Sequence, residues 1–378
     1  MRRLAAAAVL LALAAALVVS SGVISIKASS RHWAVTSWIL DFAKRRSVAT
    51  RSAGITPPPL TDDALVQLGA AHYDGGCRPC HGRPGGSMPV IPAGMTPQPP
   101  DLARQMARWQ PREIYYLVAH GIKFTGMPAW PAPERHDEVW AVVAFLRALP
   151  GLDAAAYARL AAGAAPAVNG AVEGTDAAAA RCAACHRPDA REPGSDLVPV
   201  LTGQRLAYVT AALDAYASGA RKSGIMGPIA AALDSARRHA VAAHVTVLRD
   251  AGGAGLAPAP PPGGVVPSPS GDPADSSLFP SPGGVTTRGD LVSAGDPARD
   301  VPPCAGRHGP AARERDPRFP KLAGQREGYL RRQLQLFAEN RRGGSPYADI
   351  MRAIAVRLTP QQIDQAARAY AALPGAEP

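Results

Sequence analysis

The stretch Cys77-Arg-Pro-Cys80-His81 decides the fold, and Cys182-Ala-Ala-Cys185-His186 repeats its pattern later in the chain. Both are complete C-x-x-C-H motifs, and one such match would arise by chance in roughly one sequence per thousand of this cysteine and histidine content. Two thiols at this spacing lie on one face of a helical turn, where both can add to the vinyl groups of a porphyrin, and the histidine that follows can ligate the iron. The two motifs therefore predict two covalently bound haems of the c type, with His81 and His186 as axial ligands.

Other uses of paired cysteines fit this chain less well. A zinc ribbon would bring both C-x-x-C pairs into one small fold, but here they lie about 100 residues apart and each adjoins a histidine. A thioredoxin-like redox pair would need a β-α-β context that the alanine-rich helical patterns lack. Structural disulfides fail because the chain has five cysteines, an odd number, and all of them lie inside the motif clusters.

A third cluster, Cys304-Ala-Gly-Arg307-His308, departs from the motif because Arg307 stands where the second thiol should be. Only Cys304 could form a thioether bond there, while His308 keeps the position of the axial ligand. Three outcomes are open: a haem held by one bond, a haem bound without a covalent bond, or an empty domain kept for packing. If iron is present, the permanent charge of Arg307 beside the ring would raise its reduction potential.

Each cluster is followed at a similar distance by a methionine that could supply the second axial ligand. A thioether on the far side of the ring raises the reduction potential and closes the iron to small ligands. The candidates, with their distance from the histidine of the same cluster, are Met127 (46 residues from His81), Met226 (40 from His186) and Met351 (43 from His308). His120 is a rival to Met127, Met88 and Met95 are weaker candidates in a Pro/Gly-rich loop, and Met106 is expected to fill the core.

The N-terminal segment, residues 1–30, is predicted to be a membrane anchor. Arg2 and Arg3 precede an uncharged stretch from Leu4 to Ile26, whose 23 residues exceed a typical signal-peptide core and can cross a bilayer as a helix. We therefore interpret it as an uncleaved signal anchor. The alternative is a signal peptide that is cleaved near the small residues Ser20–Gly22.

Residues 31–61 are predicted to form an interfacial helix and a linker. Apolar residues recur there at helical spacing and a basic end follows: Trp33, Val35, Trp38, Ile39 and Phe42. Such a pattern is typical of a helix that lies in a membrane surface. An ordinary helix docked on the first globular unit would show the same pattern, so both interpretations stay open.

Three globular units follow. We expect the first, second and third units at residues 62–152, 173–252 and 295–376, with a Pro/Gly/Ser-rich linker at 253–294 that cannot bury a core. The second and third units are repeats, because Leu201-Thr-Gly-Gln-Arg205 is answered by Leu322-Ala-Gly-Gln-Arg326, each about 20 residues after its cysteine cluster. The last helix is expected to begin with a capping box formed by Thr359 and Gln362.

Length, composition and charge limit the possible functions. The chain has 378 residues, of which 47% are apolar but only 5% aromatic, so each unit is short of bulky core residues and a non-protein group would help to fill it. The formal net charge of +11 favours acidic partners or anionic membrane surfaces. No nucleic-acid-binding signature is present and the basic residues are scattered, so we expect no nucleic-acid partner.

With these motifs the chain resembles the class I c-type cytochromes over about two thirds of its length. The resemblance implies an all-α fold of tandem class I cytochrome c domains behind the N-terminal transmembrane signal anchor. It implies that the first and last helices of the first unit cross at Gly69, Tyr73 and Trp140, and that the second and third units are similar to the halves of two-domain dihaem cytochromes. Haem attachment in this family takes place outside the cytoplasmic membrane, which implies periplasmic domains anchored to the inner membrane.

The filled axial positions predict the chemistry, one-electron transfer through the porphyrin edge, because no coordination site is left for a substrate. We therefore expect an electron-transfer protein of a respiratory chain rather than an enzyme, with a terminal oxidase, a soluble cytochrome or a dehydrogenase as its redox partner. One alternative is the cytochrome c subunit of a periplasmic dehydrogenase complex. Another, of a different class, is a haem peroxidase, which would need one five-coordinate iron.

Overall fold

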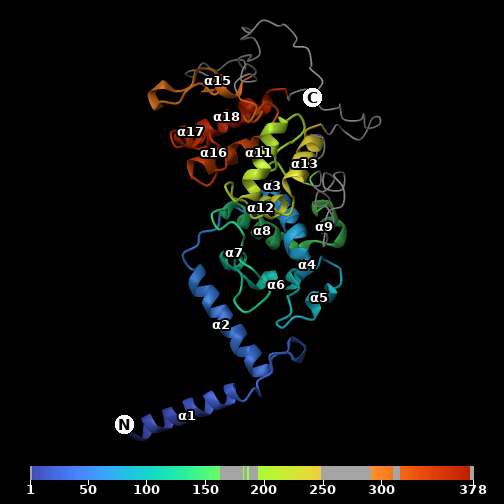
Figure 1. Cartoon of the computed structure of the whole chain (residues 1–378), viewed down its shortest axis with the longest axis vertical. Helices are drawn as coiled ribbons and strands as arrows, with labels where there is room; N and C mark the ends of the chain where they lie inside the picture. The colour runs from blue at the N-terminus through green and yellow to red at the C-terminus, as the bar shows by residue number, and fades with distance from the viewer. Residues whose placement is uncertain are drawn as a thin grey trace.

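The computed structural model describes residues 2–161, 182, 185, 186, 195–247, 291–309 and 316–374. The regular secondary structure in these ranges is helical, and their one isolated β-bridge joins Asp296 and Val301. The all-α prediction is therefore confirmed for this part of the chain. Figure 1 shows an N-terminal helix that extends outward, the helices of the first unit next to it in space, and the later helices stacked beyond them.

Helix α1 (Arg2–Ser20) extends away from the rest of the molecule, and all of its side chains are exposed (Figure 1). Among the described helices it alone has the length and composition to cross a membrane, a property that it shares with signal sequences. Its 19 residues span about 28 Å, close to the hydrocarbon thickness of a bilayer. The helix ends at Ser20, so the predicted 23-residue span to Ile26 is not one continuous helix.

Helix α2 (Ala34–Ser52) divides into two halves. Trp38, Ile39 and Phe42 of the first half are exposed, as expected of a helix in a membrane surface. The second half packs on helix α7 (Pro111–His120), where Val48 and Ser52 are buried. The second half is thus docked on the first unit, and the membrane-surface interpretation of the first half stays a prediction.

The first unit packs around the crossing of α3 (Asp63–His72) and α8 (His136–Ala148). Gly69 makes this crossing possible, because a Cβ there would lie 1.9 Å from the carbonyl oxygen of Ala141. Tyr73 packs on Phe145, with 5.1 Å between the ring centroids. Trp140, the aromatic residue expected at the crossing, instead stacks on a tyrosine ring of α7 at 4.3 Å. The expected role of Trp140 is therefore taken by Phe145.

Shorter helices complete the first unit: α4 (Arg78–His81), α5 (Val90–Ala93), α6 (Leu102–Gln105) and, after α8, α9 (Ala154–Ala161). Tyr157 and Ala161 of α9 belong to the same hydrophobic core as Tyr73 and Phe145. Side chains beyond residue 152, where the sequence predicts the unit to end, thus pack into its core.

The second and third units each have a core of their own. The helices described in the second unit are α11 (Leu206–Ala217), α12 (Met226–Ala231) and α13 (Ser235–Val247). Those of the third unit are α14 (Leu291–Ala294), α15 (Ala305–His308), α16 (Glu327–Ala338), α17 (Ala348–Ala355) and α18 (Pro360–Ala372). Residues 253–290 of the predicted linker lie outside the described residues. Its last four residues, 291–294, form α14, where Leu291 and Val292 are buried. The capping box of Thr359 and Gln362 is confirmed at the start of α18.

The second and third units exchange hydrogen bonds in pairs that are related by approximate two-fold symmetry. The side chain of Gln204 donates to the carbonyl of Lys321 (2.7 Å) and accepts from its amide (3.1 Å). Gln325 makes the same two bonds to the carbonyl and amide of Val200, at 2.6 and 3.1 Å. The equivalent residues differ by 121 in number, which is the shift between the two repeats. The two units that share the sequence repeat thus pack against each other as a pair.

Candidate functional site

The first C-x-x-C-H motif lies directly after α3. A π-helical turn, η2 (Tyr73–Cys77), leads from α3 into α4, so Cys77 and Cys80 fall on one helical turn. Such π-turns are frequent at functional sites. The Tyr73 hydroxyl donates to the carbonyl of Gly82 (2.8 Å) and thereby ties the end of the motif to the helix crossing. Both cysteines are half-buried and neither forms a disulfide, so both thiols fit the attachment of a porphyrin.

The histidines of the two complete motifs are anchored in the same way. His81 Nδ1 lies 3.0 Å from the carbonyl oxygen of Pro100, and His186 Nδ1 lies 3.0 Å from that of Pro199. A carbonyl can only accept, so the hydrogen bond assigns the proton to Nδ1 and leaves Nε2 the lone pair that a metal needs. Burial lowers the pKa of both imidazoles and favours their neutral form. Both side chains therefore fit the role of an axial ligand.

The loop after α7 carries Met127. Its amide donates to Thr125 Oγ1 (3.1 Å), which fixes the turn before the thioether. Met95, a weaker candidate by sequence, reaches this loop, because its methyl group occupies the space that a Cβ on Gly126 would need. Met95 therefore contacts the loop that carries Met127. His120, the other rival, is the last residue of α7 and its ring packs on a neighbouring tyrosine.

Met226 and Met351 both lie in short helices, Met226 at the first residue and Met351 inside its helix. Met226 opens α12, and its side chain packs on the same hydrophobic core as Cys182. Met351 lies half-buried in α17, whereas Cys304 packs on the core around Tyr329. No hydrophobic core of the described residues contains both Met351 and Cys304.

The third cluster keeps part of the motif geometry. Cys304 caps the start of α15 and is half-buried, while Arg307 is exposed. The His308 ring lies beside Phe319, with 6.0 Å between the ring centroids. Burial, together with the charge of Arg342, lowers the pKa of His308 to about 4. This site therefore keeps one thiol and a neutral imidazole, and the residue that replaces the second thiol lies in solvent.

The structure adds a pair of arginines that the sequence did not single out. Arg221 is buried, with 9% of its surface exposed, and its guanidinium lies 4.6 Å from the ring centre of Tyr216. Its counterpart one repeat later, Arg342, lies 4.5 Å from the ring centre of Phe337. Burial and the neighbouring Arg221 lower the pKa of Arg342. In the described part of the chain neither guanidinium pairs with a carboxylate.

A buried guanidinium beside a half-buried one, neither with an acidic partner among the described residues, is costly unless an anion lies beside them. Haem carries two propionate carboxylates, so Arg221 and Arg342 fit this group and would neutralise it. The signal that could have found them is the repeat itself, because they also differ by 121 in residue number. The thiols, the neutral imidazoles and this pair of cations together fit haem.

A haem bound here would supply one-electron transfer. The residues of the chain would attach the ring through cysteine, hold the iron through histidine Nε2 and balance the carboxylates with arginine. A zinc site, the other use of these cysteines, would need three or four ligand side chains together. The described residues contain no group of three or more such side chains.

Comparisons with known proteins agree with this chemistry. Residues 64–146 match the family described as cytochrome c oxidase, cbb3-type, subunit III. The thiosulfate dehydrogenase electron acceptor of Stutzerimonas stutzeri (strain A1501) is 33% identical over 198 residues, which are 52% of this chain and 81% of that protein. The protein of the same name from Thiomonas intermedia (strain K12) is 30% identical over 197 residues, 52% of this chain and 80% of that protein.

Among solved structures, the cytochrome c4 of Acidithiobacillus ferrooxidans is 28% identical and covers 51% of this chain and 98% of its own, with a TM-score of 0.37. The two sequence relatives are matched over most of their own length, and they confirm both the resemblance drawn from the motifs and the expectation of an electron carrier. The chain belongs to the class I c-type cytochromes, electron-transfer proteins with covalently bound haem c.

Proposed function

We propose that this chain is a membrane-anchored periplasmic cytochrome with at least two haems, which carries electrons one at a time in a respiratory chain toward a terminal oxidase. The observation that carries the proposal is the matched anchorage of two imidazoles, each with Nδ1 bonded to a proline carbonyl at 3.0 Å. Equal geometry at the end of two C-x-x-C turns supports two equivalent sites. The proposed ligands are Cys77, Cys80, His81 and Met127 for the first haem, and Cys182, Cys185, His186 and Met226 for the second.

The proposed domains are the three units expected from the sequence, with α9 added to the first and α14 to the third. The third site, formed by Cys304, His308 and Met351, keeps its three possible outcomes. Its neutral imidazole supports a bound haem, and Arg307 in place of the second cysteine allows at most one thioether bond.

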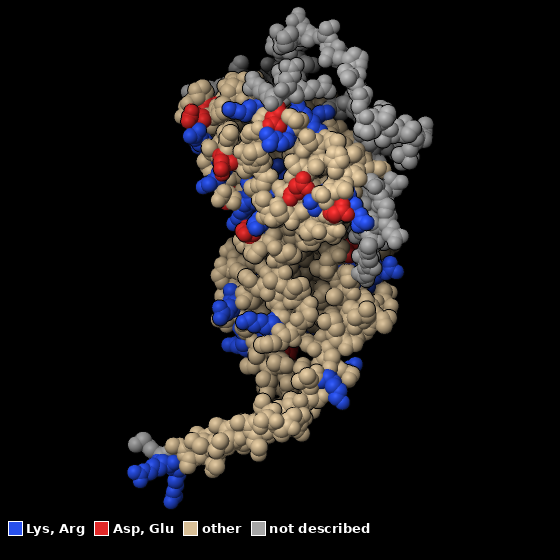
Figure 2. Space-filling view, viewed as in Figure 1, with Lys and Arg blue, Asp and Glu red and all other residues tan. Residues whose placement is uncertain are grey.

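Anchoring in the inner membrane is the second part of the proposal. Helix α1 would supply the span, and the stacked rings of Trp38 and Phe42 would lie where the chain leaves the bilayer. Figure 2 shows several Lys and Arg and little acidic surface over the unit next to these helices in that view. Such a surface favours anionic headgroups and weak, salt-sensitive docking of acidic redox partners.

Haem staining on a denaturing gel, combined with intact mass, tests the haem sites. We expect two or three covalent haems in the full chain and one fewer when Cys77 and Cys80 are both replaced by Ala. A blank stain from cells with working haem attachment would refute the proposal. An optical redox titration would then count the centres and show whether their potentials suit an oxidase.

The names of the two relatives favour a second candidate, in which the chain is a permanent subunit of a periplasmic dehydrogenase. Both relatives are named as electron acceptors of thiosulfate dehydrogenase. Purification at high salt separates the candidates, because a subunit brings its large partner with it whereas a carrier comes alone. Rapid peroxide turnover by the wild-type protein would instead favour the peroxidase alternative.

A further inference from the structure

A buried carboxylate joins the first unit to the second at the two loops that carry the proposed axial methionines. Glu138, at the start of α8, is 4% exposed. Its Oε2 accepts from Trp130 Nε1 (3.1 Å) in its own unit and from the amide of Gly224 (2.6 Å) in the next. Its Oε1 accepts from Ser223 Oγ (2.7 Å), also in the second unit. One side chain thus satisfies donors from both loops.

Ser223 passes this contact on to the helix that begins with Met226. Its hydroxyl donates to Glu138 and accepts from the amide of Met226 at 3.0 Å, so it caps the first turn of α12. A hydroxyl has a single proton, and the carboxylate therefore fixes the orientation in which Ser223 can accept. Glu138 orders the start of α12 from the neighbouring unit.

The two loops also touch directly. Trp130 lies three residues after Met127, and Gly224 lies two residues before Met226. A Cβ on Gly224 would lie 2.3 Å from Nε1 of Trp130, so only glycine lets this backbone rest on the indole. The indole also faces the ring of His72 in α3, with 6.0 Å between the ring centroids. The contact between Gly224 and Trp130 therefore leaves no room for a side chain at position 224.

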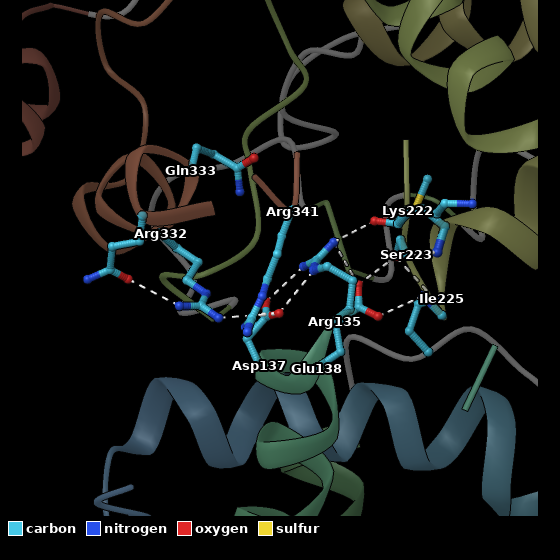
Figure 3. Close-up of polar contacts among 12 residues, drawn as sticks. Arg135, Asp137, Glu138, Lys222, Ser223, Ile225, Arg332, Gln333 and Arg341 are labelled. Carbon is cyan, nitrogen blue, oxygen red and sulfur yellow. Dashed lines mark hydrogen bonds and ion pairs between the residues drawn. The ribbon is translucent and has the colours of Figure 1, made fainter. Parts of the chain in front are cut away.

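Charges around Glu138 extend the contact to the third unit (Figure 3). Arg135 pairs with Glu138 (3.1 Å) and with Asp137 (2.8 Å), and it donates to the carbonyl of Lys222 (2.8 Å). Asp137 also pairs with Arg332 of α16 at 3.2 Å. Figure 3 shows these side chains converging above α8 from segments of all three units.

We propose that Glu138 clamps the Met127 loop to the Met226 loop and makes the first two units one rigid electron-transfer body. The inference rests on the proposed function, since the two loops matter for electron transfer only if they coordinate haem iron. Within such a body an electron passes between the sites of one molecule: one site is oxidised by one electron, the other is reduced by one, and no proton or covalent bond changes. Glu138 is a positioning residue for this transfer.

Hydrogen exchange of the full-length holoprotein tests the clamp. In Glu138→Gln one amide oxygen replaces two carboxylate oxygens, so we expect the amides of residues 224–227 to exchange about ten- to a hundredfold faster. Gly224→Ala wedges the contact from the second unit and should accelerate exchange around Trp130 in the first. Glu134→Gln makes the same chemical change at an exposed carboxylate nearby and should leave both segments at wild-type rates.

The second measurement is the rate at which an electron equilibrates between the two sites after partial photoreduction. A purely structural contact would leave this rate unchanged. We expect a rate that is independent of protein concentration in the wild type and at least about tenfold slower in Glu138→Gln. Unchanged exchange and an unchanged rate in a variant that stains for haem would refute the clamp alone. A wild-type chain without covalent haem would refute the proposed function instead. If Glu138→Gln does not fold, exchange around Trp130 in Gly224→Ala decides.

Discussion

Gly69→Ala tests the helix crossing that positions the first motif. The new Cβ would lie 1.9 Å from the carbonyl oxygen of Ala141 and 2.8 Å from Cβ of Phe145. That oxygen belongs to the backbone of α8 and cannot rotate away, so the two helices must separate by about 1.5 Å to reach ordinary contact. Overpacking of this kind costs up to about 3 kcal/mol, while the better helix propensity of alanine contributes about 1 kcal/mol in return. With the cost at the upper end of this range, as the 1.9 Å approach to a backbone oxygen implies, the net loss of stability is about 2 kcal/mol.

Hydrogen exchange at the buried amides of α8 measures this loss. A reduction of about 2 kcal/mol in the free energy of opening corresponds to exchange that is about thirtyfold faster. Gly75→Ala is the matched control, because nothing lies within 4 Å of the Cβ that it would gain. Its effect should stay within about 0.5 kcal/mol. Wild-type exchange in Gly69→Ala, or equal acceleration in Gly75→Ala, would refute this account of the crossing.

The other parts of the chain give three more predictions. Gln204→Leu and Gln325→Leu each leave a backbone amide and carbonyl unpaired at the contact between the second and third units. Each should therefore lower the free energy of unfolding in urea by about 2–3 kcal/mol, whereas the control Gln361→Leu, at an exposed position, should change it by almost nothing. Clearly unequal losses in the two variants would contradict the two-fold pairing. Arg307→Cys completes the third motif, so intact mass of this variant should show three covalent haems, whereas a count of two would show that this unit takes up no covalent haem. In a chain without residues 1–27, Phe42→Ser should weaken binding to anionic vesicles about thirtyfold, because burial of a phenylalanine contributes about 2 kcal/mol; equal binding would place α2 outside the membrane surface.

The helical turn of the C-x-x-C-H motifs could be predicted because its geometry is local. Cys77, Cys80 and His81 act within one helical turn, and that spacing fixes their geometry whatever surrounds them. The capping box of Thr359 and Gln362 is local in the same sense. Such features are set by neighbours in the sequence, so the structure adds their anchorage but does not change their role.

The helix crossing shows where pattern reasoning stops. Ala141 and Phe145 lie four residues apart and share one face of α8, whereas Trp140 is turned by about 100° from Ala141. Once Gly69 meets Ala141, Phe145 is the aromatic residue that faces α3. The sequence contains both aromatics at the right distance from the end of the unit, and only the packing decides between them.

Glu138 could not have been found from its own segment. It follows Arg135 and Asp137 in a charged helix start, a pattern that predicts a solvated first turn. Its burial depends on Ser223 and Gly224, which lie 85 and 86 residues away in another unit. A contact between units leaves no periodic signal in either unit, because each side of it is only a few residues long.

The third unit contacts the second unit through Arg342, whether or not it binds a haem of its own. Arg342 lies within 3.4 Å of the Tyr208 hydroxyl of the second unit, and its charge acts on the same region as Arg221. An anionic group beside these two guanidiniums would be neutralised by residues from both units. Arg307 is exposed and takes no part in this contact or in the paired glutamine bonds. Loss of the second thiol in the third motif therefore leaves intact the charge and the packing that the third unit gives to the second.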